Sequence, residues 1–263
     1  MCAGAEVEDI RENDASGEMM TDIWTVIWKE WKEMLVQRGS LRGGLLVLIV
    51  IVGVFGVVFP LQEGPGWVES RLALIYGAWL PLFLVSGTVA DSFAGERERK
   101  TLETLLASRL SDRSILFGKI GAAVAYGWGL TLISASLALI AVNVAHGRGH
   151  LLLYSPMIAL GLVLLSLLGA GLAAGSGILV SLRASTVRQA YQQLSLAIVL
   201  LTILPLFGFR ALPDDWRVQL ARAIVTASTT QIVVVVAAVL VVLDAGLLAI
   251  AMARFQRARL ILD

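Results

Sequence analysis

The chain has 263 residues, of which 57% are hydrophobic and only 16% are charged, and its mean hydropathy is +0.81. Soluble domains carry roughly 25% charged and about 45–50% apolar residues, so this composition excludes an ordinary cytosolic enzyme and a disordered chain. A net charge of +1 provides no positive field that would bind nucleic acid. Cys2 is the single cysteine, which excludes an intrachain disulfide and a thiolate metal cluster. The composition predicts an all-α polytopic membrane protein.

The N-terminal part of the chain contains no predicted span. Residues 1–20 are acidic and poor in apolar side chains, which predicts a disordered tail. Residues 21–38 predict an amphipathic helix whose one face collects Trp24, Ile27, Trp28, Trp31 and Leu35. Tryptophan favours the lipid headgroup layer, so we expect this helix to lie in the membrane interface. An amphipathic helix packed on a soluble core is the alternative, but the composition leaves no room for such a core.

Six apolar segments are long enough to cross a bilayer, which needs about 20 residues. They fall in a transmembrane domain predicted for residues 39–263, and they run over 43–61, 72–93, 115–144, 156–182, 190–209 and 231–253. About 40 residues precede the first segment, so we expect it to be a span and not a cleavable signal peptide.

The positive-inside rule gives the orientation. Of the 21 Lys and Arg residues, 16 lie on the side that holds both chain ends, and five lie on the other side. Both termini are therefore expected in the cytoplasm of a multi-pass protein of the cell membrane. On the outer side, residues 213–227 predict a short amphipathic extracellular helix, with a plain connecting loop as the alternative.

Residues 94–114 form the only sizeable polar cytoplasmic loop that the sequence predicts between spans. Leu102, Leu105 and Leu106 make a short apolar stripe at helical spacing inside it. Such loops are usually solvated connectors. An apolar stripe within a charged loop favours instead a segment that docks into the groove of a partner.

The stretch from Phe93 to Lys119 contains three phrases at fixed spacing: FAGERE at 93–98, TLETLL at 101–106, and Arg113, Ile115, Gly118 and Lys119. This order resembles the signature of ABC transporter permeases of the type 2 export class. The layout resembles that family over residues 21–263. The sequence departs from the common pattern at Lys100, where a glycine is frequent, and at Arg109, where a proline is frequent.

The resemblance implies that the loop holds a coupling helix that docks on a separate nucleotide-binding subunit. The residues that it places in this ATPase contact are Glu96, Arg97, Glu98, Thr101, Leu102, Glu103, Leu105 and Leu106. We expect the leucines to enter an apolar cleft of the partner, and Arg97, Glu98 and Glu103 to set the orientation by charge.

The chain itself is not expected to be an enzyme. Gly118-Lys119 is followed by Ile120, and Arg113, not glycine, stands at the position where a P-loop needs its first glycine, so the pair does not form a P-loop. By resemblance, ATP and Mg²⁺ are bound by the partner. The permease works in the lipid bilayer with a second copy of itself or a close relative, and with two copies of the ATPase, to export a substrate. An ion-gradient-driven secondary transporter and a non-transporting membrane relay coupled to an ABC ATPase remain alternatives. The substrate stays open, with a weak preference for hydrophobic cargo.

Asp244 lies near the middle of the last predicted span and is the candidate intramembrane polar site. An ionisable side chain at this depth is costly, which favours a role in a translocation path or in proton linkage. A protonated Asp244 that bonds to Tyr126 or Ser134 is the structural alternative, and the sequence does not decide between them. His146 and His150 are too few for a metal site, so we expect none.

Overall fold

A computed structural model of the chain describes residues 19–33, 41–147 and 149–255. The predicted tail is thus almost wholly outside the described residues, as are residues 34–38 of the predicted interfacial helix. The described residues form helices and no strand. After a helix over residues 19–33, the elements are α2 (Leu41–Gly53), the π-helix η1 (Val54–Val58), α3 (Phe59–Glu63), α4 (Gly66–Glu69), α5 (Leu72–Glu98), α6 (Leu102–Leu106), α7 (Asp112–His146), α8 (Pro156–Arg183), α9 (Val187–Ala211), α10 (Asp214–Thr226) and α11 (Thr229–Arg254).

Six helical stretches of the described chain are long and apolar enough to cross a membrane. They are Leu46–Glu63, which combines α2, η1 and α3, and then α5, α7, α8, α9 and α11. The predicted number of spans and the all-α polytopic class are thereby confirmed.

The helices α5 and α8 form the centre of the bundle, and small residues let them approach closely. A Cβ on Gly169 of α8 would lie 2.7 Å from the Ala78 carbonyl oxygen, and one on Gly177 would lie 2.6 Å from Val89. Glycine is therefore required at both positions, and small residues at a helix contact allow this close approach.

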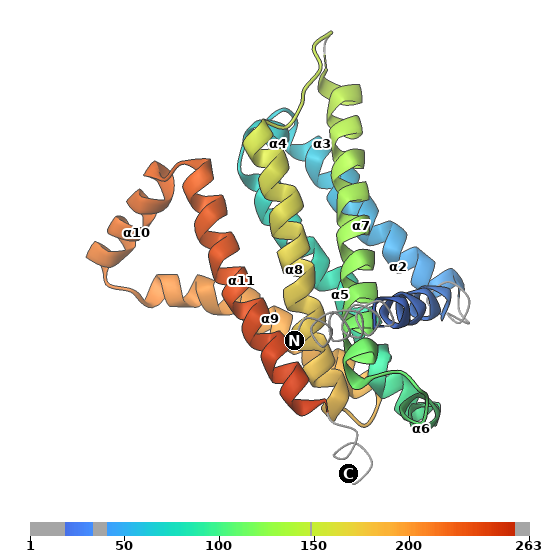
Figure 1. Cartoon of the computed structure of the whole chain (residues 1–263). Helices are drawn as coiled ribbons and strands as arrows, with labels where there is room; N and C mark the ends of the chain where they lie inside the picture. Colours follow the sequence, from blue (N-terminus) through green and yellow to red (C-terminus); the bar gives the residue numbers. More distant parts are fainter. Residues whose placement is uncertain (1–18, 34–40, 148, 256–263) are drawn as a thin grey trace, which may run out of the picture.

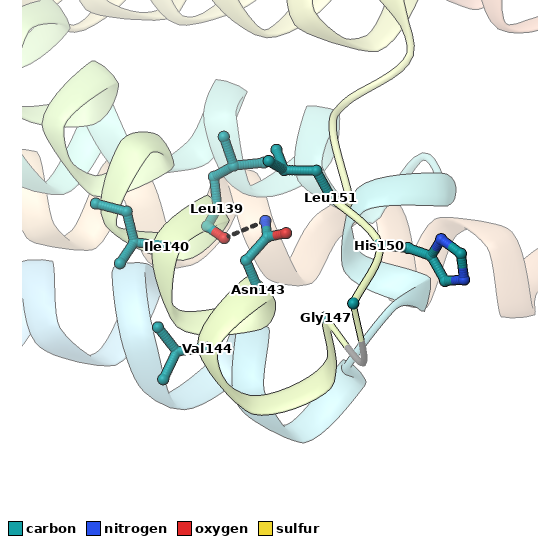
Figure 2. Close-up of a pocket in the computed structure, with 8 residues that line it drawn as sticks. Leu139, Ile140, Asn143, Val144, Gly147, His150 and Leu151 are labelled. Atoms are coloured by element: carbon teal, nitrogen blue, oxygen red, sulfur yellow. Dashed lines mark hydrogen bonds between the residues drawn. The ribbon is translucent and has the colours of Figure 1, made fainter.

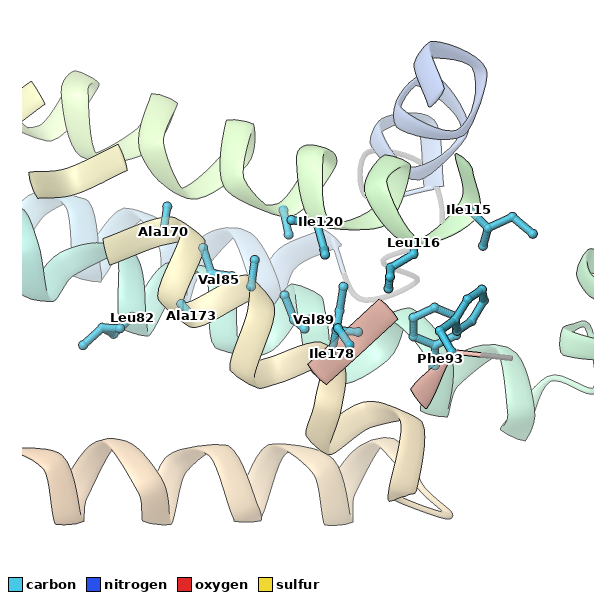
Figure 3. Close-up of a cluster of buried hydrophobic side chains, with 14 of the residues drawn as sticks. Leu82, Val85, Val89, Phe93, Ile115, Leu116, Ile120, Ala170, Ala173 and Ile178 are labelled. Atoms are coloured by element: carbon cyan, nitrogen blue, oxygen red, sulfur yellow. The ribbon is translucent and has the colours of Figure 1, made fainter. Parts of the chain in front are cut away.

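Apolar side chains from α5, α7 and α8 pack together in the part of the bundle where α5 ends and α7 begins (Figure 3). Val89 and Phe93 of α5 meet Ile115 and Leu116 of α7 and Ile178 of α8, and all five are fully buried. This cluster fixes where α5 ends and α7 begins, which is where the predicted cytoplasmic loop lies.

The first span contains a π-helical turn at Val54–Val58. Proline has no backbone N–H to donate, and Pro60 stands just after this turn, where the hydrogen bond of the Phe59 amide reaches back to Val54. Gly56 within the turn packs against Ser134 of α7, with room for nothing larger. The widened turn and its glycine thus set the contact between the first and third spans.

Helices α9, α10 and α11 lie to one side of the bundle (left in Figure 1), and most of their apolar surface is exposed. Only a few residues of α9 and α11 are buried, and none of α10 is. Arg71 at the start of α5 links α10 to the bundle, because its guanidinium donates to the carbonyl oxygens of Ile224 and Ala227 at 3.1 and 2.7 Å. The exposed faces of α9 and α11 are suited to lipid or to another membrane subunit.

The predicted loop at 94–114 is largely helical. The helix α5 continues through Glu98, α6 begins at Leu102, and α7 begins at Asp112, where the Ser111 side chain accepts a hydrogen bond from the Ser114 amide. The predicted start of the third span at Ile115 was therefore too late, because Ser111 caps the helix before the apolar run begins.

Candidate functional site

The helix of residues 19–33 lies across the N-terminal part of α7 (dark blue in Figure 1). It approaches α7 at two glycines. A Cβ on Gly118 would lie 2.5 Å from Val26, and one on Gly121 would lie 3.2 Å from Ile27. The Trp31 indole N–H also donates to the Ala122 carbonyl oxygen at 3.4 Å. Residue size on α7 therefore determines how closely this helix packs.

The predicted apolar face of this helix is divided between two directions. Val26 is buried against α7 and Ile27 is partly covered, whereas Trp24, Trp28 and Trp31 are exposed. The three indoles thus keep much of their surface free of the bundle.

A buried ion cluster joins this helix to α5 and α7. The Lys119 ammonium donates to Glu30 Oε1 at 2.7 Å, to Glu96 Oε1 at 3.0 Å and to the Ser92 carbonyl oxygen at 2.9 Å. It also lies 5.0 Å from the centre of the Phe93 ring, on the same helix as Ser92 and Glu96. One ammonium therefore holds three separate segments of the chain together.

The members of this cluster are withdrawn from water. The side chains of Lys119, Glu96 and Glu30 are 1%, 3% and 10% exposed. Lys29 approaches the same Glu96 oxygen at 3.0 Å from the solvent side. Two ammonium groups thus offset two glutamates, and removing one partner would leave a buried carboxylate without its counter-ion.

Burial lowers the pKa of Lys29, but the neighbouring carboxylates, Glu96 above all, raise it by more. The net pKa lies above the ordinary value of 10.5, so Lys29 stays protonated at neutral pH. The second oxygen of Glu96, Oε2, is buried and accepts no hydrogen bond from the described residues.

The next two residues of α5 link it to the connection between α8 and α9. The Arg97 guanidinium donates to the carbonyl oxygens of Ala184 and Leu182, at 2.6 and 3.1 Å. Glu98 Oε1 accepts from the Val187 amide at the first residue of α9, at 3.0 Å. The end of α5 therefore contacts both neighbouring helices, and a displacement there would reach them.

The chain reverses between α5 and α6 through a tight turn at Lys100. The amide of Thr101 donates to the Glu96 carbonyl oxygen and that of Lys100 to the Arg97 carbonyl oxygen, at 2.9 and 3.1 Å. This pair of bonds is a Schellman motif, and it places Lys100 at φ 57°, the left-handed conformation that glycine adopts most easily. The glycine that is frequent here in similar sequences fits this backbone without strain.

The leucine stripe of α6 is turned toward the bundle. Leu102 is 8% exposed and belongs to the buried cluster of Figure 3, and Leu105 packs against that cluster and is partly covered by it. Leu102 is therefore covered by the chain's own core and Leu105 has only part of its surface left, while the entry of these leucines into a partner's cleft stays a prediction. The side chain of Leu106 is outside the described structure.

The exposed side of this element is polar. Lys100, Thr101, Glu103 and Thr104 are exposed around the start of α6. Of the eight predicted contact residues, Thr101 and Glu103 thus lie at the surface, whereas Glu96, Arg97 and Glu98 bond within the chain. The structure brings all eight positions to one end of the bundle but gives them different surroundings.

The comparison with known families bears on this arrangement. Residues 21–217 match the family described as ABC-2 type transporter. The chain belongs to this family. No curated protein matches it. The chain is therefore the permease component of a membrane transporter, as the FAGERE and TLETLL phrases predict.

The ABC-2 match begins at residue 21 and so includes the helix that packs on α7. Sequence reasoning missed that Lys29, Glu30 and Lys119 belong to the site. Two local patterns point to these residues. Lys119 is the last residue of the family motif, and Glu30 stands one helical turn after Val26 and thus on the same helix face. Nothing in the sequence alone indicates that these charges, far apart in the chain, meet.

Asp244, the other predicted site residue of this ABC-2 permease, lies on α11 and does not join the cytoplasmic cluster. Its carboxylate faces Gly171 of α8, and Oδ1 accepts no hydrogen bond from the described residues. Ser134, one of its two predicted partners, packs against Gly56 of the first span instead. Asp91, in contrast, is paired with Arg99 at 3.1 Å.

A hollow of about 500 Å³ lies at the opposite end of α7 from the ion cluster (Figure 2). Its lining is mostly apolar, with Leu139, Ile140, Val144 and Leu151. The side-chain amide of Asn143 donates to the Leu139 and Leu152 carbonyl oxygens, and its oxygen accepts from the Leu152 amide, each at 2.8 Å. The Asn143 side chain in this wall thus binds the segment between α7 and α8.

Proposed function

We propose that the chain is the transmembrane subunit of an ATP-driven exporter and moves a substrate out of the cytoplasm with energy from a separate ABC ATPase. The observation that carries the proposal is the construction of the cytoplasmic end. There α6 presents a polar surface, while Leu102 and Leu105 pack it against the core cluster, and the buried ion cluster holds the neighbouring end of α5 to α7. Membership of the ABC-2 family supports the same assignment.

The proposed contact uses the exposed residues of the element and not its leucine stripe. Lys100, Thr101, Glu103 and Thr104 would meet the ATPase, and Leu102 and Leu105 would pass its displacement to the core cluster. Arg97 and Glu98 would pass it to α8 and α9 through their hydrogen bonds. ATP and Mg²⁺ would be bound by the ATPase.

Two permease copies and two ATPase copies form the proposed complex. The uncovered apolar faces of α9 and α11 support a second membrane subunit beside them. The proposed direction, export and not import, rests on the resemblance to the export class.

The test is co-purification of the full-length chain with the ABC ATPase of its own transporter. Glu103→Arg combined with Thr104→Trp should lower the amount of ATPase retained at least tenfold, because both side chains are exposed on α6. The matched control is Asp215→Arg, which reverses an exposed acidic residue on α10, and it should retain the ATPase in full. A complex that tolerates the α6 double variant unchanged contradicts the proposed contact.

A further inference from the structure

Asp244 lies deep inside the membrane-spanning part of α11. This helix begins at Thr229 and ends at Arg254, well to either side of the aspartate. At a rise of about 1.5 Å per residue, the carboxylate is about 22 Å from one end and about 15 Å from the other. Both distances place it within a hydrocarbon layer that is about 30 Å thick.

Two other ionisable residues within the spans are compensated by opposite charges. Asp91 lies 3.1 Å from Arg99, and Lys119 lies 2.7 Å from Glu30. Both stand within about two turns of the cytoplasmic end of their helix. No ion pair is found for Asp244 among the described residues, so its charge lacks the compensation that the other two have.

The position of the carboxylate is shaped by a glycine on the facing helix. A Cβ on Gly171 would lie 2.9 Å from Asp244 Oδ2, closer than real Cβ contacts allow. The absence of a side chain at Gly171 thus makes the space that the carboxylate occupies. Oδ1 has almost no accessible surface and accepts no hydrogen bond from the described residues.

The chemistry of this position selects one class of ligand. An uncompensated carboxylate attracts a cation and repels an anion, and the attraction is strong where water is excluded. The surrounding surface is apolar, with Val241 and Leu243 exposed and Leu247 packed beside Gly175. Asp244 is only half-buried, so a group at the surface of the seam between α8 and α11 can reach it. A cation with a hydrophobic body satisfies both requirements.

We propose that the seam between α8 and α11 at Asp244 and Gly171 binds hydrophobic cations. This inference rests on the proposed transport function and narrows its substrate class to amphipathic molecules with a positive charge. Asp244 supplies the counter-charge, and Gly171 keeps the carboxylate in place.

The experiment uses a pair of probes with the same shape and opposite charge, tetraphenylphosphonium and tetraphenylborate. The full chain in lipid nanodiscs is titrated with each probe, and saturable binding is separated from partition into the lipid by competition with excess unlabelled probe. We expect saturable binding of the cation only. Asp244→Asn should weaken it about tenfold or more, because the charged partner is lost.

Three further variants separate a binding role from general packing. Gly171→Ala keeps the charge but displaces the carboxylate, and it should also weaken binding of the cation. Gly246→Ala adds a methyl group to α11 where nothing lies within 4 Å, and Asp91→Asn removes a carboxyl group elsewhere; both should bind as the unaltered chain does.

Unchanged affinity for the cation in Asp244→Asn, or equal saturable binding of both probes, would overturn the proposal. The measurement needs no ATPase. Its failure would therefore leave the co-purification result standing, and failure of that result would not affect the binding result.

Discussion

At the scale of single residues, Lys119 is the centre of the buried ion cluster and holds three segments of the chain together. Lys119→Met removes the ammonium that Glu30 and Glu96 share, while the unbranched apolar side chain still fills the space. We expect a loss of unfolding free energy on the order of 3 kcal/mol, because two carboxylates stay buried with only Lys29 nearby. Thermal unfolding of the purified chain in detergent measures the effect.

Lys32→Met is the control for this prediction, since Lys32 is exposed on the helix of residues 19–33. Surface substitutions of this kind usually change stability by less than about 0.5 kcal/mol. Adding Glu30→Gln and Glu96→Gln to Lys119→Met should restore part of the loss. If Lys119→Met were as stable as the control, the cluster would have no role in holding the helix.

The turn at Lys100 leads to a prediction of increased stability. Lys100→Gly should stabilise the chain by about 1 kcal/mol, because the left-handed backbone at φ 57° is strained for any residue with a Cβ. Lys100→Ala retains the Cβ and should give no such gain. Thermal unfolding of the two variants side by side measures the difference, and equal stability would show that the turn is not strained.

At the scale of elements, the packing of the helix of residues 19–33 on α7 depends on glycine. Gly118→Ala introduces a methyl group 2.5 Å from Val26, which forces the helix away from α7 and lengthens the Lys119–Glu30 contact. We expect a lower melting temperature, measured by loss of monodisperse protein on heating in detergent.

Gly129→Ala is the matched control, because it lies on the same helix and a Cβ there has nothing within 4 Å. Alanine favours helix by up to about 1 kcal/mol over glycine, so this variant should melt at the same or a higher temperature. A Gly118→Ala chain that behaves like Gly129→Ala would mean that the helix is not tightly packed.

The elements also show what sequence reasoning reaches. Apolar runs of about 20 residues are a local signal, and they predict the six spans. The surroundings of Leu102 cannot be predicted in the same way. The helical spacing of the leucines indicates an apolar face, but it does not show which surface covers that face. The capping of α7 by Ser111 is also a local signal, because serine is a favoured N-cap residue. The meeting of Glu30, Glu96 and Lys119 depends on long-range packing, which no local pattern encodes.

At the scale of the whole molecule, the orientation in the membrane is open to a direct test. In a Cys2→Ser background, Arg109→Cys lies beside α6 and His150→Cys lies beyond the other end of α7, and both positions are exposed. The excess of Lys and Arg on the α6 side predicts that only His150→Cys reacts with an impermeant maleimide added outside intact cells. Arg109→Cys should react once the membrane is permeabilised. The reverse pattern would place α6 outside the cell and remove the basis for an ATPase contact.

The ion cluster also constrains the order in which the chain is assembled. The contacts described for the helix of residues 19–33 are with α7 and with Glu96, both of which come much later in the chain. During synthesis this helix emerges before its counter-ions and before the glycines on which it packs. It therefore reaches its final position only after the third span has been inserted, and a ribosome-bound chain that ends before Gly118 would leave Glu30 in water and the helix undocked.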